Sequence, residues 1–322
     1  IRQSFIQIFM KLISFVFSFR NEEKNLKNLI DRVHKAVKKT ENWNYELIFV
    51  NDDSTDNSEK TLIDLQKEFP IKIINMSRRF GTNPCVLAGF ENCSGDCVIY
   101  MDSDLQDPPE LITELVKQHE KGFDIVHTRR TKRLGESKSK LFLTNIAYTI
   151  IDKLSDIDLE KDVGDFKLIS RRALDKILEQ KEYNPYIRGL SVWVGFKQGY
   201  VDYVRNARES GESKFSLFDE GPVTQFIRGV TSYSLKPLYL GVLLGFFAFL
   251  FSIVLIVYAL YAKLTGVAVP GTTGILIVIS FFSGALLSTV GIMGIYLARI
   301  FEQTKGRTRY VIKEIKNYKQ SK

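Results

Sequence analysis

The fold of this 322-residue chain is decided by the stretch Cys97-Val-Ile-Tyr-Met-Asp-Ser-Asp-Leu-Gln-Asp-Pro-Pro-Glu110. Its first five residues, Cys97–Met101, are apolar and have the length of a buried strand. Three acidic residues follow within six positions, and two prolines then open a helix that we expect to reach Lys121, because proline is favoured at a first helical turn. A strand that runs through carboxylates into a helix is one unit of an α/β fold.

The same alternation of strand and helix extends on both sides of this stretch. The further strands that we predict from short apolar runs are Leu12–Phe19, Tyr45–Val50, Ile71–Asn75 and Phe123–His127. The helices that we predict between them are Glu23–Lys39, a segment that Asp56 could cap and that turns Leu62, Ile63 and Leu65 inward, and Pro84–Glu91. Such repeats predict a mostly parallel sheet covered by helices, with ligands bound beyond the carboxyl ends of the strands.

The first apolar run allows a second interpretation. Residues from Phe5 to Phe19 are apolar enough to resemble a short signal peptide. The run lacks a small-residue cleavage site, however, and continues directly into Arg20-Asn-Glu-Glu23. We therefore predict that Leu12–Phe19 is the first buried strand of the sheet.

The composition is an average over two unlike parts. The chain is 45% hydrophobic and 25% charged, carries a net charge of +8 and has a mean hydropathy of −0.06, which are values typical of a soluble protein. Its aromatic content, its glycine count and its three cysteines exclude a disordered chain, a collagen and a disulfide scaffold. Between Lys236 and Arg299, however, Lys263 is the only Asp, Glu, Lys or Arg. The sequence therefore predicts a polar domain followed by a membrane anchor.

Two uncharged segments of membrane-spanning length make up this anchor. Leu238–Tyr261 has 24 residues and Gly274–Ala298 has 25, and about 20 helical residues suffice to cross a bilayer. The alternative is a buried helical hairpin inside a soluble core. The run Gly241-Val-Leu-Leu-Gly245 fits a small-residue packing pattern, either within the hairpin or between protomers of a homo-oligomer.

Charge predicts the orientation of the anchor. The segment from Arg299 to Lys322 has eight Lys or Arg residues and two acids, and the positive-inside rule assigns such a segment to the cytoplasm. Because two spans put both flanks on one side, we expect a multi-pass protein of the inner membrane whose large domain and both termini are cytoplasmic. The predicted organisation is a domain over residues 1–213, a juxtamembrane segment over 214–236, two spans within 237–299 and a basic tail over 300–322.

Acidic residues follow two of the predicted strands. Asn51-Asp52-Asp53-Ser54 comes after Tyr45–Val50, and Asp102 and Asp104 come after Cys97–Met101. Hard oxygen ligands of this kind suit Mg²⁺ or Mn²⁺, especially where diphosphate oxygens complete the coordination shell. The alternative is turn chemistry, because Asp and Asn also stabilise turns through local hydrogen bonds. This alternative is weaker for Asp102 and Asp104, because a buried run delivers three acids together.

Five motifs occur in one order along the chain. They are Phe19-Arg-Asn-Glu-Glu23, Phe49-Val-Asn-Asp52, Asp102-Ser-Asp-Leu-Gln-Asp-Pro-Pro-Glu110, Gly164-Asp-Phe166 and Arg208-Glu-Ser-Gly-Glu-Ser-Lys214. Together with the two apolar segments, the chain resembles the polyprenyl-phosphate glycosyltransferases of glycosyltransferase family two, the group of bactoprenol glucosyltransferases and dolichol-phosphate mannosyltransferases. The resemblance implies a GT-A fold and the inverting transfer of a sugar from a nucleotide-sugar to a membrane polyprenyl phosphate.

The resemblance also implies roles for individual residues. The residues that would contact the nucleotide-sugar are Glu22, Asp52, Arg78 and Asp102, with Asp52 near the base. The residues that would hold Mg²⁺ or Mn²⁺ are Asp102, Asp104 and Gln106. Asp165 matches the residue that the family usually assigns as the catalytic base.

Three positions depart from the family pattern. The first strand ends in Ser18-Phe-Arg20 and lacks the proline that often precedes the Asn-Glu pair. Asp53 stands where the family usually has glycine, which leaves the turn after Asp52 open. Thr82 stands where a Lys or His often follows Arg78-x-Phe-Gly81, which leaves the nucleotide contact from that loop open.

The binding of the acceptor can be argued from charge. A phosphate monoester has a second pKa of about 6, so its attacking oxygen is largely ionised at neutral pH and hardly needs a general base. The obstacle is to bring two anions together, and fixed cations and a divalent metal can overcome it. The cations that we predict to bind the acceptor phosphate are Arg130, Arg133, Arg208 and Lys214, the alternative for each being a solvated surface cation. On this argument, Asp165 orients the acceptor or a basic partner rather than removing a proton.

The leading hypothesis is a membrane-anchored enzyme that uses UDP-glucose, because Asp-Leu-Gln-Asp-Pro-Pro is close to the bactoprenol glucosyltransferase branch. Alternatives are a GDP-mannose or aminoarabinose donor and a non-catalytic membrane scaffold that retains the fold. The intact acidic motifs argue against the scaffold. We expect a nucleotide-sugar, a polyprenyl phosphate and the bilayer as partners, and no nucleic acid.

Overall fold

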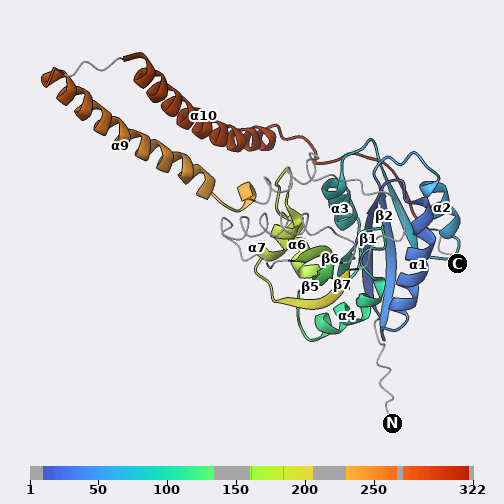
Figure 1. Ribbon diagram of the computed structural model, residues 1–322. Coiled ribbons are helices and arrows are strands. Elements are labelled where there is room, and N and C mark those ends of the chain that lie inside the picture. The colour runs from blue at the N-terminus through green and yellow to red at the C-terminus, as the bar shows by residue number, and fades with distance from the viewer. Residues whose placement is uncertain are drawn as a thin grey trace, which may run out of the picture.

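The computed structural model describes residues 10–133, 160, 162–183, 185–205, 230–266 and 271–318. Within these ranges the chain forms an eight-stranded sheet with helices on both faces, and two long helices project from this domain (Figure 1). The α/β class expected from the sequence is confirmed.

The strands and helices alternate along the first part of the chain. The strands are β1 (Lys11–Phe19), β2 (Trp43–Asn51), β3 (Ile71–Met76), β4 (Cys97–Tyr100), β5 (Ile125–Arg133), β6 (Val163–Ser170), β7 (Gln198–Arg205) and β8 (Ile312–Lys316). The helices are α1 (Glu23–Val37), α2 (Ser58–Leu65), α3 (Thr82–Glu91), the short 3₁₀ helix η1 (Pro109–Leu111), α4 (Ile112–Glu120), α6 (Arg171–Leu178), α7 (Ile187–Trp193), α9 (Lys236–Leu264) and α10 (Gly271–Thr304). Every strand and helix predicted up to His127 is present, with ends that differ by a few residues.

Helix α2 shows one expectation that holds and one that fails. The carboxylate of Asp56 accepts a hydrogen bond from the backbone N–H of Ser58 at 3.1 Å, so it supports the start of the helix as expected. Leu62 is fully buried, but Ile63 is 37% exposed rather than turned inward. The helix has only eight residues and packs on the domain through one narrow stripe, which leaves the adjacent position at the surface.

The sheet is mixed, with four of its seven strand pairs parallel and three antiparallel. Its order is β7-β5-β6-β4-β1-β2-β3-β8. The neighbours β3, β2, β1 and β4 are parallel, as the alternation of strand and helix predicts. Strand β6 lies antiparallel between β4 and β5, and β8 runs antiparallel along the free edge of β3. These two strands do not belong to a strand-helix-strand unit, so the alternation could not predict them.

The sheet separates two apolar layers. Alternate residues of β1 point to opposite faces, so that Phe15 and Phe17 join the layer under α1, α2 and α4, whereas Val16 joins the layer under α3, α6 and α7. All three side chains are fully buried. The ring of Phe17 stacks on Phe49 of β2, with ring centroids 4.6 Å apart. The parallel strands are thus buried on both faces, which explains why they are continuous apolar runs in the sequence.

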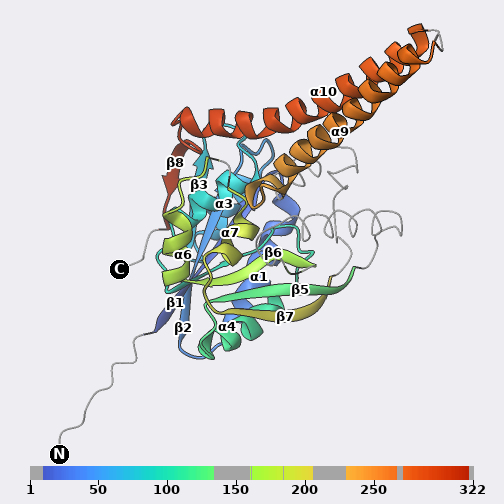
Figure 2. The ribbon, with the colours of Figure 1, turned by 90° about the vertical axis from the view of Figure 1, so that its left-hand side faces the viewer.

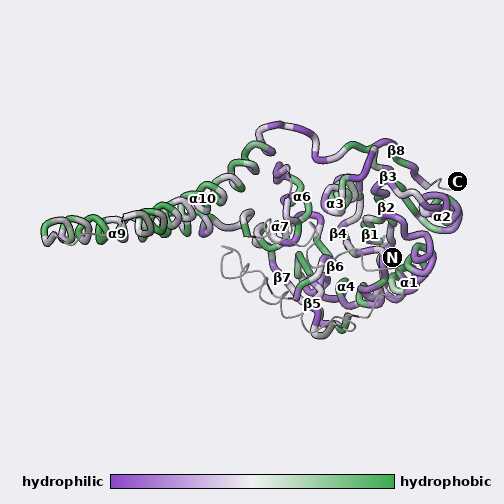
Figure 3. Tube along the Cα trace, turned by 45° about the horizontal axis from the view of Figure 1, so that its top comes forward, coloured by the Kyte–Doolittle hydropathy of each residue, from purple (hydrophilic) through white to green (hydrophobic). Residues whose placement is uncertain are grey.

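Helices α9 and α10 form an apolar hairpin. Both are long and apolar enough to cross a membrane, and hydrophobic residues predominate in both (Figure 3). The alternative of a hairpin buried in a soluble core is wrong for the described residues, because side chains such as Leu287 and Val242 are about 70% exposed. A Cβ at Gly241 would lie 2.9 Å from the side chain of Thr289, so this glycine lets α9 approach α10 closely.

The chain returns to the sheet after the apolar hairpin. Residues 300–322 are expected to form a tail, but α10 continues to Thr304 and Ile312–Lys316 form β8 beside β3 (Figure 2). The side chain of Lys316 forms an ion pair with Glu59 of α2 at 2.7 Å. An edge strand needs only backbone hydrogen bonds on one side, so a charged segment of this kind can serve as one.

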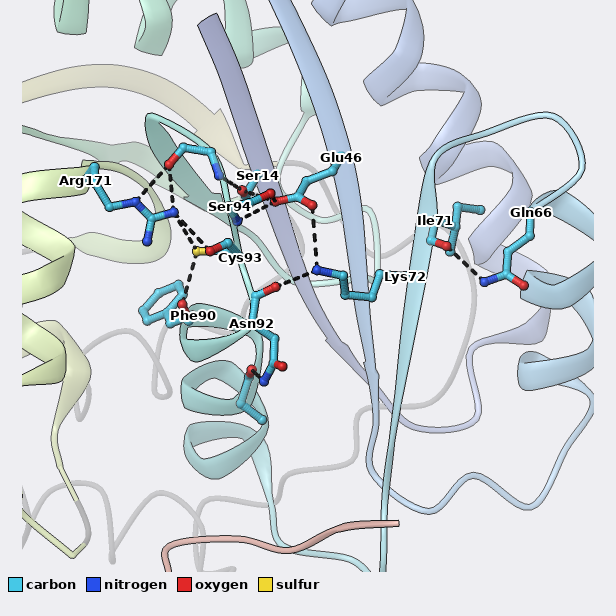
Figure 4. Close-up of polar contacts among 12 residues, drawn as sticks. Ser14, Glu46, Gln66, Ile71, Lys72, Phe90, Asn92, Cys93, Ser94 and Arg171 are labelled. Atoms are coloured by element: carbon cyan, nitrogen blue, oxygen red, sulfur yellow. Dashed lines mark hydrogen bonds and ion pairs between the residues drawn. The ribbon is translucent and has the colours of Figure 1, made fainter. Parts of the chain in front are cut away.

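A network of polar groups around Glu46 fixes the turn between α3 and β4 (Figure 4). We call it the Glu46 network. One carboxylate oxygen of Glu46, in β2, accepts hydrogen bonds from the hydroxyl of Ser14 at 2.6 Å and from the backbone N–H and hydroxyl of Ser94 at 2.7 and 2.8 Å. The ammonium of Lys72 lies 3.8 Å from the other oxygen. The guanidinium of Arg171 donates to the carbonyls of Cys93 and Gly95. The Glu46 network therefore joins β1, β2 and β3 to the turn.

We expect Glu46→Ala to destabilise the domain. It leaves the donors of Ser14 and Ser94 without this acceptor and removes the counter-ion of Lys72, and breaking a charged network of this kind costs about 3 kcal/mol. The exposed Glu41 offers a matched control, since Glu41→Ala should change the free energy of unfolding by less than about 0.5 kcal/mol. Urea unfolding of the detergent-solubilised protein measures both. Equal midpoints for the two variants would contradict the role given to Glu46.

Candidate functional site

A pocket of about 400 Å³ opens at the carboxyl ends of the parallel strands, and we call it the carboxyl-edge pocket. Its lining comes from the ends of β1, β2 and β4, from β6, from the turn before α3 and from the start of α7. The residues are Ser18, Phe19, Arg20, Asn21, Glu22, Asp52, Arg79, Gly81, Thr82, Asn83, Cys85, Tyr100, Asp102, Ser103, Asp104, Asp165, Tyr186, Ile187 and Arg188. The pocket lies where ligands are expected in an open α/β sheet.

Asp52 holds one wall of the pocket. Its buried carboxylate accepts hydrogen bonds from the backbone N–H groups of Phe80 at 2.6 Å and of Gly81 at 3.0 Å. The turn before α3 is thereby fixed against the end of β2, and it presents Arg79 to the pocket. Arg78 is not part of the lining, because its guanidinium stacks over the ring of Phe80 at 4.1 Å and is exposed.

Asp53, which stands where the family usually has glycine, keeps the backbone conformation of a glycine. Asp53 has φ +58°, in the left-handed region that favours glycine and that Asp tolerates better than most residues. The guanidinium of Arg20 donates to its carbonyl at 3.4 Å. The turn after Asp52 is therefore of the kind that glycine would make, and the aspartate occupies it at some cost in strain.

Asp102 and Asp104 lie together at the end of β4. The hydroxyl of Tyr100 donates to Asp102 at 3.2 Å, and the backbone N–H of Gln106 donates to Asp104 at 3.2 Å. Leu105, directly after Asp104, has φ +60°, a strained conformation for a bulky residue that turns the chain sharply here. Burial raises the pKa of Asp102, and the negative charges of Asp165, Asp104 and Asp107 raise it further.

This pair of carboxylates fits a divalent cation. Burial, and then the charges of Asp165, Asp104 and Asp107, raise the pKa of Asp102, and a bound cation would relieve this cost of keeping it ionised. No group of three or more His, Cys, Asp or Glu residues suited to a metal occurs in the described ranges, so an ion here would need oxygens from a ligand as well. Asp104 lines the carboxyl-edge pocket, whereas Gln106 does not.

Asp165 has the opposite environment. Arg188 of α7 grips its carboxylate with two hydrogen bonds, from Nη2 to Oδ2 at 2.7 Å and from Nε to Oδ1 at 3.3 Å. Burial alone would raise the pKa of Asp165, but the charge and hydrogen bonds of Arg188, followed by the charges of Lys167 and Arg130, hold it below the usual range. Asp165 therefore stays ionised, and it is a weak proton acceptor.

Lys167 supports this pair from inside the sheet. Its side chain is 1% exposed, and its ammonium donates to the hydroxyl of Ser191 at 3.2 Å. Burial lowers the pKa of Lys167 to about 7, although the charge of Asp165 opposes this shift and that of Arg188 adds to it. A lysine so deep in the sheet is tolerated because an anion lies two residues away on the same face of β6.

Two of the four cations predicted to bind the acceptor phosphate, Arg130 and Arg133, lie within the described residues. The guanidinium of Arg130 is 9% exposed, donates to the hydroxyl of Tyr203 at 3.0 Å and lies 3.6 Å from Asp107, so it is built into the sheet and does not line the pocket. Arg133 is the last residue of β5, opposite Arg205 in register. Arg208 and Lys214 lie outside the described residues.

The structure thus gathers five predicted residues, Glu22, Asp52, Asp102, Asp104 and Asp165, around one pocket. It adds three arginines that the sequence did not single out, namely Arg20, Arg79 and Arg188. Arg20 and Arg79 lie within quoted motifs, so their basic character inside those motifs was the available signal. Arg188 belongs to no motif, and only its ion pair with Asp165 reveals it.

Comparison with known proteins places this geometry in context. The sequence model of Glycosyl transferase family 2 matches residues 14–178, which include all five of the gathered carboxylates. An uncharacterized glycosyltransferase, YkcC of Bacillus subtilis, is 37% identical over 94% of this chain and 93% of its own length. The bactoprenol glucosyl transferase of Shigella phage SfX and a prophage bactoprenol glucosyl transferase homolog of Escherichia coli are 33% and 32% identical, each over 94% of this chain and 99% of its own length.

Substitutions at Asp53 test the left-handed turn. Glycine should be neutral or stabilise the domain by up to about 1 kcal/mol, because it removes the strain of a side chain at positive φ. Valine should destabilise it by about 1–2 kcal/mol. Thermal unfolding of the purified variants, with Asp53→Ala as the intermediate control, gives the order. A glycine variant less stable than the valine variant would contradict the observed backbone.

Proposed function

The chain belongs to glycosyl transferase family 2 and is a GT-A-like transferase, and we propose that it moves a hexose from a nucleotide-sugar to the phosphate of a polyprenyl lipid, with inversion at the anomeric carbon. The observation that carries this proposal is the extent of the match to the bactoprenol glucosyl transferases. It covers 94% of the chain, so it takes in the carboxyl-edge pocket and the apolar hairpin together.

The donor that we propose is UDP-glucose. Glu22 and Asp52 line the pocket on one side, and Arg20 and Arg79 supply positive charge for a diphosphate. Two of the relatives are named for glucosyl transfer, which favours glucose. GDP-mannose and an aminoarabinose donor are the alternatives within the same fold.

Asp102 and Asp104, with Gln106 beside them, would hold Mg²⁺ or Mn²⁺. When bound, the cation supplies positive charge that stabilises the departing diphosphate. The protein itself contributes two carboxylates at the pocket, and the strained turn at Leu105 follows them directly.

The chemical step follows from the charges. An ionised phosphate oxygen of the acceptor forms a bond to the anomeric carbon, the bond from that carbon to the donor diphosphate breaks, and the nucleoside diphosphate leaves with the electron pair. No proton needs to move, because the phosphate is already ionised above a pKa of about 6. Asp165 then orients Arg188 toward the pocket instead of acting as a base. We assign Arg130, Arg133, Arg208 and Lys214 to the acceptor side, with Arg130 acting from within the sheet.

The apolar hairpin would place this chemistry at a membrane. Tyr233 before α9 belongs to the core of the domain, and β8 after α10 belongs to its sheet, so both ends of the hairpin attach to one body. If α9 crosses the bilayer, α10 must cross back. The basic residues after Arg299 then favour the cytoplasmic side of the inner membrane, where a lipid acceptor reaches the pocket by lateral diffusion.

A donor panel tests the proposed reaction. The full-length protein, undecaprenyl phosphate and Mn²⁺ are incubated with UDP-glucose, UDP-galactose, GDP-mannose and an aminoarabinose nucleotide, and lipid-linked sugar is measured. We expect product with UDP-glucose, and about a hundredfold lower kcat for Asp104→Asn but not for the exposed control Asp64→Asn. Product with GDP-mannose alone would overturn the proposed donor, and absence of lipid product with every donor would overturn the acceptor.

The pH profile tests the role of Asp165. At saturating donor and cation we expect kcat to rise as the acceptor ionises near pH 6 and to stay flat from about pH 7 to 9. Asp165 should cause no further change of kcat in this range, because its lowered pKa keeps it ionised throughout. Asp165→Asn should lower kcat without adding a limb. A wild-type rate that followed a carboxyl group of strongly raised pKa at saturating cation, and no longer did so in Asp165→Asn, would instead make Asp165 the base.

A further inference from the structure

The first turn of α7 supplies a wall of the carboxyl-edge pocket. Tyr186, Ile187 and Arg188 line it, and Arg188 is the group that grips Asp165. Arg188 lies 23 residues from Asp165 and on another element, so the ion pair exists only if α7 keeps its place. The contacts that hold α7 in place therefore decide whether Asp165 is paired with Arg188.

The polypeptide that enters the apolar hairpin packs directly on α7. A Cβ at Gly189 would lie 2.2 Å from Cε2 of Tyr233 and 2.8 Å from Cδ1 of Tyr186, so only glycine allows this contact. The rings of Tyr186 and Tyr233 lie 6.4 Å apart, and the hydroxyl of Tyr233 donates to the carbonyl of Tyr186 at 3.4 Å. Tyr233 is 9% exposed and belongs to the same apolar layer as Ile187 and Leu190.

The polypeptide that leaves the hairpin holds the segment before α7. The side-chain amide of Gln303, in the last turn of α10, donates to the carbonyl of Lys181 at 2.8 Å and accepts from the backbone N–H of Tyr183 at 2.8 Å. The guanidinium of Arg309 donates to the carbonyl of Gln180 at 2.8 Å. These contacts are to backbone groups, so they fix the path of the chain rather than one side chain.

The two ends of the hairpin are also tied to each other. The hydroxyl of Tyr296 donates to the carbonyl of Ser234 at 2.7 Å, and the guanidinium of Arg299 donates to the hydroxyl of Ser232 at 2.9 Å. The base of the hairpin and the segment leading into α7 thus form one connected block. A tether that only anchored the domain would not need these contacts.

We propose that Tyr233 and Gln303 are positioning residues for Arg188, so that the base of the apolar hairpin is part of the frame of the carboxyl-edge pocket. The inference rests on the proposed function, since it concerns the residues that act on the acceptor. Displacement of a catalytic group by about 1 Å can cost a hundredfold in rate, so a loosened α7 should lower kcat without abolishing donor binding.

Tyr233→Ala is the primary test, with Tyr239→Ala as its matched control. Tyr239 is a tyrosine of α9 that is 66% exposed, so its removal should not move α7. We expect Tyr233→Ala to lower kcat by about tenfold or more with a nearly unchanged donor KM, and Tyr233→Phe to restore most of the rate. The loss should be the same with undecaprenyl phosphate and with a short, water-soluble isoprenyl phosphate. A loss with the long lipid alone would overturn positioning in favour of lipid delivery.

Hydrogen–deuterium exchange gives a reading that does not depend on turnover. The amides of Leu190 and Val194, which donate to the carbonyls of Tyr186 and Leu190, should exchange at least about tenfold faster in Tyr233→Ala, while β2 stays unchanged. Faster exchange throughout the domain with unchanged kcat per folded molecule would make Tyr233 merely structural and overturn the proposal.

A second pair of variants tests the proposal independently, in case Tyr233→Ala fails to fold. Gln303→Ala should accelerate exchange over residues 180–190 and lower kcat, whereas the exposed neighbour Glu302→Ala should do neither. Unchanged exchange and kcat in both Tyr233→Ala and Gln303→Ala would overturn the proposal. An inactive wild-type protein would instead overturn the proposed function. The exchange measurements alone would then show whether Tyr233 and Gln303 hold α7 in place.

Discussion

The ion pair between Asp165 and Arg188 is the contact on which the arrangement of the site depends. It joins β6 in the middle of the sheet to α7, and α7 in turn contacts the base of the apolar hairpin. Without Arg188, Asp165 would lose the strongest of the interactions that hold its pKa below the usual range, leaving the charges of Lys167 and Arg130. The pair therefore sets a charge pattern as well as a position.

That charge pattern separates two carboxylates that a sequence would treat alike. Asp102 and Asp165 line the same pocket, yet the pKa of the first is raised by burial and by neighbouring anions, whereas Arg188 lowers that of the second. Environments that push two pKa values apart assign different tasks to the two groups. Here the raised group suits a cation ligand and the lowered group suits a fixed counter-ion. Asp165 thus serves as the counter-ion of Arg188 and not as a base.

The sequence predicted the parallel half of the fold well and the rest poorly, for physical reasons. Strands such as Leu12–Phe19 are buried on both faces, so their continuous apolar runs are visible without coordinates. Strand β6 carries Asp165 and the buried Lys167, and their place in the sheet makes sense only once Arg188 is known to pair with Asp165. Strand β8 is rich in charge because it needs only the backbone of β3 as a partner. Long-range contacts of this kind leave no periodic signal in the sequence.

The site residues follow the same division. Asp52, Asp102 and Asp104 were predicted because they follow strands whose ends could be located, and the architecture requires those ends to meet. Arg78 was predicted from its motif, but Arg79 faces the pocket, because Asp52 fixes the turn in the one orientation that stacks Arg78 on Phe80. A motif thus identified the turn but not which of its two arginines points inward.

The two edges of the sheet show why some buried acids are structural and others functional. At the amino edge, one oxygen of Glu46 accepts three hydrogen bonds from donors fixed on β1 and on the turn before β4, and Lys72 lies beside the other oxygen. At the carboxyl edge, Asp102 has Tyr100 as a donor and three other carboxylates nearby. A carboxylate surrounded by donors stabilises the fold, whereas one surrounded by anions favours a bound cation. The chain thus uses one residue type for both purposes, and the neighbours that the fold supplies decide which purpose it serves.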